Sequence, residues 1–83
     1  MNTLRTYLNS MSPPEQEAFA ARCGTTIGYL RKALSVGQLL GETLALAIER
    51  ESAGAVPLAS LRPDFDAALA ASGYVRTEHH KAA

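Results

Sequence analysis

The sequence predicts an all-α fold, a small bundle of about five helices with a helix-turn-helix. The chain has 83 residues and 47% of them are hydrophobic, which is enough for one core in one domain. It has no Trp, 2 Phe and 3 Tyr, so the core must consist mainly of Leu and Ala, which favour helices over sheets. Apolar residues also recur at helical spacing between glycines and prolines.

The first helix is expected over residues 3–11. Its apolar residues are spaced i, i+3, i+4 and i+7, which places them on one stripe of a helix; they are Leu4, Tyr7, Leu8 and Met11.

The second helix is expected over residues 13–23. Ser12 can cap it, Pro13 suits the first helical position, and Glu15 stands three residues after Ser12, as a capping box requires. Gly24 can take the left-handed conformation that closes a helix. The predicted apolar face contains Phe19, Ala20 and Cys23.

Thr26 is the predicted N-cap of a third helix over residues 27–34, whose buried face contains Leu30, Ala33 and Leu34. Residues 35–41 hold two glycines and are predicted to be a loop. A fourth helix is expected over residues 42–52, with Gly54 after it. Its residues at helical spacing are Leu44, Ala47, Ile48 and Glu51.

Leu58 and Leu61 can lie on a short helical turn, and Pro63 is expected to begin a last helix that Gly73 closes. We therefore predict one domain over residues 1–75 and a flexible C-terminal tail over residues 76–83.

The net charge is zero, but the charges are unevenly distributed. Residues 1–35 hold four bases against two acids, and residues 36–83 hold four bases against six acids. No acid lies between Glu17 and Glu42. This asymmetry suggests an anionic partner for one face of the protein.

Several functions are not expected. The single cysteine, Cys23, excludes an intramolecular disulfide and an all-cysteine zinc cluster, and a reducing, cytoplasmic location is the simplest interpretation. No apolar run is long enough to cross a membrane. We find no catalytic or cofactor-binding motif, and His79-His80 lack a third metal ligand at useful spacing. We therefore predict no enzyme activity, no cofactor and no metal.

The joint between the second and third helices has the arrangement of a helix-turn-helix. Ala20 lies four residues before Gly24, where a large side chain would keep the helices apart, and Leu30 lies six residues after it. Ordinary packing of a helical hairpin is the alternative explanation for this spacing.

A longer ordered match favours the helix-turn-helix over ordinary hairpin packing. The sequence resembles the helix-turn-helix of Cro-type and C-type phage repressors, and more narrowly the YdaS-like family of prophage Cro-like regulators, also described as antitoxins. The resemblance covers about residues 3–66, not residues 67–83. It rests on Leu4, Tyr7-Leu8, Phe19-Ala20-Ala21-Arg22-Cys23-Gly24, Tyr29-Leu30, Leu46-Ala47-Ile48-Glu49 and Leu61-Arg62-Pro63-Asp64.

The resemblance implies a lambda-repressor-like helical domain that binds double-stranded DNA through its third helix. The sequence departs from the family in two places. Residues 36–41 carry no base where family members commonly have several, and Thr25 stands where an apolar residue is more usual. The first departure removes contacts to phosphate.

With the third helix packed through its apolar face, its outward residues enter the major groove. Arg31 can make a paired contact to guanine or a phosphate contact, and Lys32 suits phosphate. Ile27 can cover a thymine methyl or pack into the core. The predicted DNA-binding residues are Gln16, Thr26, Ile27, Gly28, Arg31, Lys32 and Ser35.

The remaining assignments each have a reason. Gly28 costs up to about 1 kcal/mol relative to Ala in a helix, which close approach to DNA would explain. Gln16, together with nearby backbone N–H groups, can bind a phosphate at the start of the second helix. Thr26 can cap the third helix and also reach the DNA backbone.

The predicted function is sequence-specific binding to an operator by a transcriptional repressor. We expect a homodimer on DNA, because operators of this kind are two-fold symmetric with half-sites about 34 Å apart. Residues 58–75 are the candidate dimer contact, through Phe65, Leu69, Tyr74 and Val75. Leu39 and Leu40 are either buried or part of a subunit contact. The alternative function is an antitoxin-like module that binds a protein partner instead of DNA.

Overall fold

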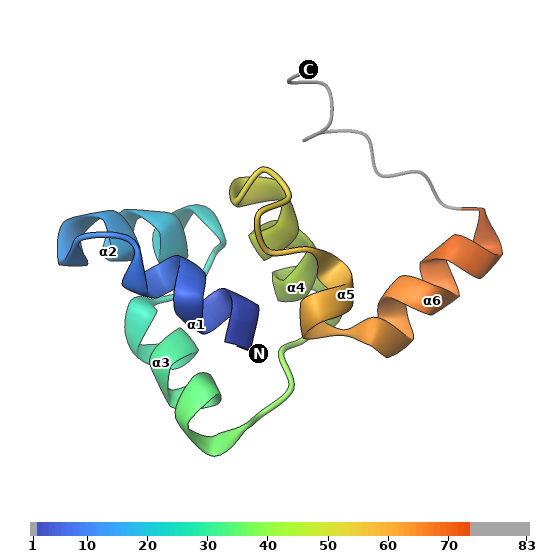
Figure 1. The fold of residues 1–83 in the computed structure, drawn as a ribbon, viewed down its shortest axis with the longest axis horizontal. Helices are drawn as coiled ribbons and strands as arrows, with labels where there is room; N and C mark the ends of the chain where they lie inside the picture. Colours follow the sequence, from blue (N-terminus) through green and yellow to red (C-terminus); the bar gives the residue numbers. More distant parts are fainter. Residues whose placement is uncertain (1, 74–83) are drawn as a thin grey trace.

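The computed structural model describes residues 2–73, and its regular secondary structure there is entirely helical (Figure 1). This confirms the predicted all-α fold. The helices are α1 (Asn2–Asn9), α2 (Pro13–Arg22), α3 (Ile27–Val36), α4 (Glu42–Glu51), α5 (Leu58–Leu61) and α6 (Pro63–Ser72). The short turn expected around Leu58 is α5, and it brings the number of helices to six in the part of the chain that is described.

Two helices, α1 and α3, end two residues away from their predicted ends, whereas α2 and α4 each end one residue earlier than predicted. α1 ends at Asn9 because the next turn tightens: the N–H of Ser10 donates to the carbonyl of Tyr7 at 3.2 Å. α3 continues through Val36 because Gly37, with φ 70°, provides its left-handed cap. Ser35 and Val36 are therefore helical, and the prediction that they belong to a loop was wrong.

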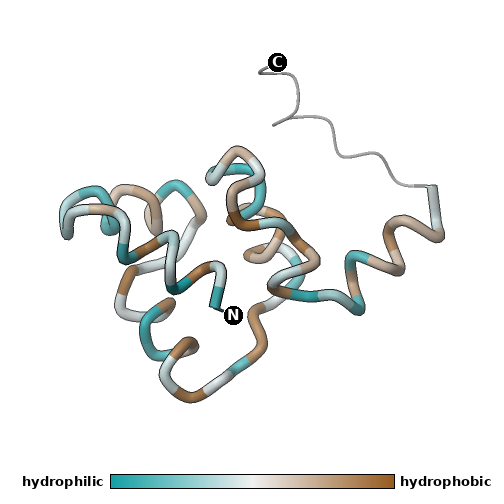
Figure 2. Tube along the Cα trace, viewed as in Figure 1, coloured by the Kyte–Doolittle hydropathy of each residue, from teal (hydrophilic) through white to brown (hydrophobic). Residues whose placement is uncertain are grey.

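The core receives fully buried side chains from α1 to α5 and from the connections between them. Figure 2 shows hydrophobic residues spread along these elements rather than confined to one segment. The largest buried side chains are Phe19, Leu4, Leu8, Leu30, Leu40, Ile48, Leu58, Leu61 and Val56. Burial of such side chains supplies most of the favourable free energy of folding.

The acid at the inner face of α4 is Glu49 rather than Glu51, which the spacing had placed with the apolar residues. Glu49 is 5% exposed, and its Oε2 accepts a hydrogen bond from the N–H of Leu58 at 3.2 Å. Nearby, the buried Ser52 Oγ accepts from the N–H of Val56 at 3.0 Å. These two bonds connect the end of α4 to the start of α5.

The last helix, α6, extends away from the other helices (Figure 1). None of its side chains is fully buried, although Phe65 and Leu69 pack partly against the core. Tyr74, Val75, the predicted tail 76–83 and His79-His80 lie outside the described residues. Within residues 2–73, no helix is long and apolar enough to cross a membrane, and no three potential metal ligands lie together.

Candidate nucleic-acid interface

The joint between α2 and α3 has the geometry that its sequence predicted. Gly24 has φ 81°, and the N–H of Thr25 donates to the carbonyl of Ala20 at 3.0 Å. Thr26 is the N-cap of α3, where its hydroxyl accepts from the N–H of Tyr29 at 3.1 Å. Ala20 and Leu30 are both fully buried. Small and branched side chains thus fix the crossing of the two helices.

The outer face of α3 is accessible at most of the predicted positions. Gly28, Lys32 and Ser35 are exposed, and Arg31 is half-buried. At Gly28, an added Cβ would meet only the hydroxyl of Thr26, at the ordinary contact distance of 3.9 Å. No close packing within the described chain therefore requires glycine at this position.

Ile27 lies between its two predicted environments. Its side chain is half-buried and packs against the core, so it is not a fully exposed apolar residue. It also lines an open hollow of about 290 Å³ beside the turn, together with Glu17, Ala21, Thr25 and Thr26. A contact to a thymine methyl remains a prediction for the exposed part of this side chain.

Arg31 is held by two neutral side chains. Its Nη2 donates to Gln16 Oε1 at 2.9 Å, and its Nη1 donates to Asn9 Oδ1 at 3.3 Å. Gln16 is itself held, because its Nε2 donates to the carbonyls of Leu8 at 2.8 Å and Met11 at 3.1 Å. The start of α2 and the end of α1 therefore fix the guanidinium of α3 together.

The donors that a phosphate contact at Gln16 would use are engaged within the chain. Both amide hydrogens of its side chain have acceptors, and its backbone N–H donates to the carbonyl of Ser12 at 2.9 Å. Pro13 and Pro14 have no N–H. The N–H of Glu15 donates to Ser12 Oγ at 3.4 Å in the capping box. Gln16 instead accepts a hydrogen bond from Arg31.

Arg5 is a further base of this region that is not among the predicted DNA-binding residues. Its Nη2 donates to the carbonyl of Leu34 near the end of α3 at 3.2 Å, while Asn9 at the end of α1 contacts Arg31. α1 and α3 therefore run antiparallel along each other. The helical spacing of α1 could have indicated this contact, because Arg5 and Asn9 are four residues apart and share a helical face.

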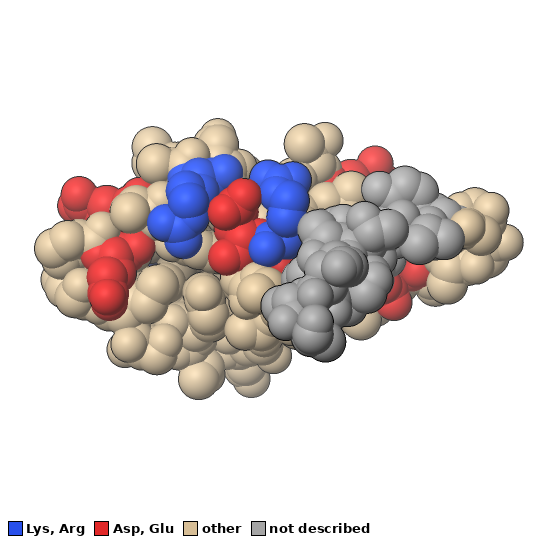
Figure 3. Space-filling model, turned by 90° about the horizontal axis from the view of Figure 1, so that it is seen from above, with Lys and Arg blue, Asp and Glu red and all other residues tan. Residues whose placement is uncertain are grey.

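The bases divide into two groups by their partners. Arg22 and Arg50 both pair with Glu51, and Arg62 pairs with Asp64. Figure 3 shows one face of the molecule, where basic side chains flank acidic ones. By contrast, α1 and α3 contain no acid, and no salt bridge within residues 2–73 involves their bases: Arg5, Arg31 and Lys32.

Exposed apolar side chains also lie on α3 and just after it. Within residues 2–73, the exposed large hydrophobic side chains are Tyr29, Val36 and Leu39, and Gln38 Nε2 donates to the Tyr29 hydroxyl at 3.1 Å. Leu40 is 1% exposed whereas Leu39 is 63% exposed. Leu40 is thus part of the core, whereas Leu39 is available for a contact with a partner.

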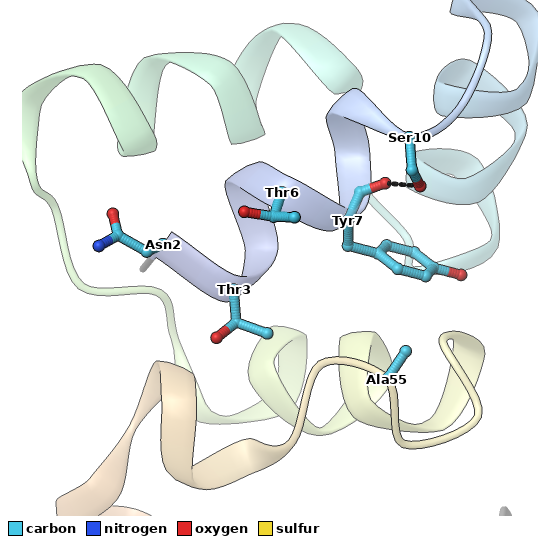
Figure 4. Close-up of a pocket in the computed structure, with 6 residues that line it drawn as sticks. All are labelled: Asn2, Thr3, Thr6, Tyr7, Ser10 and Ala55. Carbon is cyan, nitrogen blue, oxygen red and sulfur yellow. Dashed lines mark hydrogen bonds between the residues drawn. The ribbon is translucent and has the colours of Figure 1, made fainter.

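The other candidate sites carry little chemistry. Burial raises the pKa of the Cys23 thiol to about 11, so the thiol remains protonated at neutral pH. Cys23 therefore acts as a small hydrophobic residue of the core. A cavity of about 440 Å³ lies between α1 and Ala55 (Figure 4). The described residues that line it have hydroxyl and amide groups but no carboxylate, imidazole or thiol: Asn2, Thr3, Thr6, Tyr7, Ser10 and Ala55.

The chain is similar to a protein named as a prophage transcriptional regulatory protein from Escherichia coli (strain K12). The two are 31% identical over 62 residues, which is 75% of this chain and 94% of the relative. No model of a known protein family matches the chain, and no solved structure matches it. The match covers nearly all of the relative, a regulator of transcription by its name. The chain therefore belongs to the family of this prophage transcriptional regulatory protein.

Proposed function

We propose that this chain is a sequence-specific double-stranded DNA-binding protein, a Cro-like repressor of the YdaS-like type that places α3 in the major groove of an operator. The observation that carries the proposal is that the bases of α1 and α3, which are Arg5, Arg31 and Lys32, have no carboxylate partner within residues 2–73. Carboxylates pair with the three other described bases, but no acid lies on α1 or α3. Bases without a carboxylate partner attract the phosphate backbone.

The proposed contacts follow from the positions of the side chains on α3. Arg31 reaches a base edge, and Lys32 contacts phosphate as a mobile point charge. Gly28 lets the backbone approach the DNA closely, while Thr26, Ser35 and the exposed part of Ile27 contact the groove or its edge. A protein bound in this way represses transcription by blocking polymerase at the operator.

A homodimer is part of the proposal, because one module of this size reads few base pairs. The candidate contact includes Phe65 and Leu69, which α6 leaves only partly buried. We assign the DNA-binding domain to residues 1–75. Acting on DNA rather than catalysing a reaction, the protein would work in the cytoplasm, where bacterial DNA lies.

Fluorescence anisotropy with duplex from upstream of the protein's own gene, at two salt concentrations, tests the proposal. We expect tight, salt-sensitive binding that Arg31→Ala weakens at least about tenfold, since a good base contact contributes about 1–3 kcal/mol. Arg50→Ala is the matched control: it removes the same charge from a base that pairs with Glu51. Equal losses in both variants, or no binding to any duplex, would overturn the proposal.

The second candidate is an antitoxin-like module that binds a protein. The exposed side chains of Tyr29, Val36 and Leu39 favour this protein-binding function, since exposed apolar surface is typical of protein contacts. This function predicts a stable complex with a neighbouring gene product, weakened by Leu39→Ser, and no duplex binding. Co-expression followed by size-exclusion chromatography distinguishes the two functions.

A further inference from the structure

The geometry points to Asn9 and Gln16 as positioning residues that fix Arg31 to read a single guanine rather than to contact a phosphate. This inference rests on the proposed function, because it assigns a specific contact within the proposed DNA interface. It also assigns a role to Asn9, a residue outside the helix-turn-helix.

The first step is the way in which Arg31 is held. Asn9 Oδ1 accepts from Nη1 and Gln16 Oε1 accepts from Nη2, so both terminal nitrogens have a partner on another element. A guanidinium has five N–H donors in a rigid plane. These two bonds orient the plane and leave three N–H groups for a ligand, which is more than a paired contact needs.

The second step is the chemistry of the two acceptors. Both are amide oxygens, which accept a hydrogen bond without cancelling the charge of the guanidinium. The described arginines with carboxylate partners differ in this respect: Arg22, Arg50 and Arg62 each have a carboxylate within 3.2 Å. Arg31 is thus oriented and still carries an unneutralised charge.

The third step is the rigidity of the support. Gln16 cannot turn away without losing its bonds to the carbonyls of Leu8 and Met11, at 2.8 and 3.1 Å. The capping box of Ser12 and Glu15 fixes the backbone that carries it. Arg31 is therefore held by a part of the fold that is itself well ordered.

An oriented guanidinium favours base reading over phosphate binding. A phosphate can be contacted from many directions, and the exposed Lys32 on the same helix already suits that contact. Guanine presents two acceptors, N7 and O6, in a fixed geometry that a guanidinium matches only in one orientation. Fixing that orientation beforehand lowers the entropy cost of binding.

The test measures discrimination as well as affinity. Wild-type protein is titrated with its operator, with operators in which single guanines are replaced by 7-deazaguanine, and with a duplex of unrelated sequence. The replacement removes only the N7 acceptor. We expect one guanine at which wild-type protein loses about tenfold or more in affinity.

Three variants then assign the role of each residue. Arg31→Lys keeps the charge but loses the planar pair of donors, so it should abolish this discrimination and lower affinity for the operator more than affinity for the unrelated duplex. Asn9→Ala should reduce the discrimination severalfold, and Gln16→Ala should reduce it further. Ser10→Ala is the matched control for Asn9, because Ser10 is also exposed but donates to the carbonyl of Tyr7.

The outcomes separate this inference from the proposed function. If wild-type protein binds no duplex, the proposed function fails. If it binds its operator specifically while Asn9→Ala and Gln16→Ala leave the 7-deazaguanine profile unchanged, only the positioning role fails. Circular dichroism of each variant checks folding, and the exposed Asn9 keeps the test valid if Gln16→Ala unfolds. A lower melting temperature with unchanged discrimination would indicate a purely structural role and overturn the inference.

Discussion

Two regions of the molecule use arginine in opposite ways. On α1 and α3, arginines are held by neutral oxygens: Arg5 by the carbonyl of Leu34, and Arg31 by Asn9 and Gln16. Near α4 and α6, arginines are held by carboxylates. The first arrangement keeps positive charge available to a partner, whereas the second consumes it within the chain. Orientation and neutralisation are therefore separate properties of a bound guanidinium.

A chain with no net charge can therefore still carry unneutralised bases on two of its helices, α1 and α3. The acids are not spread evenly: Glu51 of α4 pairs with Arg22 and Arg50, and Asp64 of α6 pairs with Arg62. Total charge is consequently a poor guide to where positive charge is available on this protein, while the location of each carboxylate is informative.

The largest expected effect on operator affinity comes from giving Arg31 a carboxylate partner, like those of the arginines near α4 and α6. Gln16→Glu keeps an acceptor for Arg31 but places a negative charge 2.9 Å from Nη2. We expect operator affinity to fall by at least about tenfold, because the base contact of Arg31 is lost. Fluorescence anisotropy at constant salt measures the change.

Ala67→Glu is the control for Gln16→Glu, because it adds the same charge at an exposed position of α6. If both variants bind the operator with the same reduced affinity, overall charge decides binding and the difference between the two regions has no functional meaning.

A smaller effect is expected at Gly28, within the first region. Gly28→Ala should raise the free energy of unfolding by up to about 1 kcal/mol, because Ala is the better helix former and the added Cβ has room. It should also weaken operator binding, because the methyl group separates backbone and DNA. Urea denaturation and anisotropy measure the two changes.

Gly37→Ala provides the contrast for Gly28→Ala. Gly37 has φ 70°, a conformation that costs other residues free energy, so this variant should be destabilised. A Gly28→Ala protein with increased stability and unchanged affinity would show that DNA does not approach this part of α3.

The smallest effect is expected in the second region, at Asp64. Its bidentate hydrogen bonds with Arg62 lower the pKa of Asp64 to about 2, below the value of about 3.9 in an unfolded chain. A carboxylate with a lowered pKa stabilises the fold above the unfolded value and loses this contribution as the pH falls through the folded value. Asp64→Asn should therefore be less stable than wild type at pH 7, and the difference should shrink from pH 4 to pH 2.

Urea denaturation across that pH range measures the difference for Asp64→Asn, with Glu17→Gln as an exposed-acid control. Operator affinity should not change, since Arg62 lies outside the proposed interface. A stability difference that is the same at every pH would contradict the assignment of the lowered pKa to this pair.

Several features that depend on neighbouring residues could be predicted from the sequence. The capping box of Ser12 and Glu15, the cap at Thr26 and the left-handed Gly24 all form as predicted, because each depends on contacts within a few positions. Burial of Ala20 and Leu30 followed from helical periodicity. The exposure of Gly28, Lys32 and Ser35 on α3 followed from the same periodicity, while their contacts to DNA stay a prediction.

The remaining features depend on residues distant in the sequence. Arg31 meets Asn9 across 22 positions and Gln16 across 15, and neither pair has a local pattern. The carboxylate of buried Glu49 accepts a hydrogen bond from the N–H of Leu58, nine positions later in the chain. A helical pattern shows which residues share a face, but it does not show which acceptor on another element lies opposite that face.

The bond between Glu49 and Leu58 affects how this part of the protein opens. α5 has four residues, too few to persist as an isolated helix, and its first amide is secured by a carboxylate of the preceding helix. Separating the two elements would break this hydrogen bond and expose the apolar side chains packed between them, and both changes cost free energy. We therefore expect the end of α4 and all of α5 to open together, and partial unfolding to begin elsewhere in the chain.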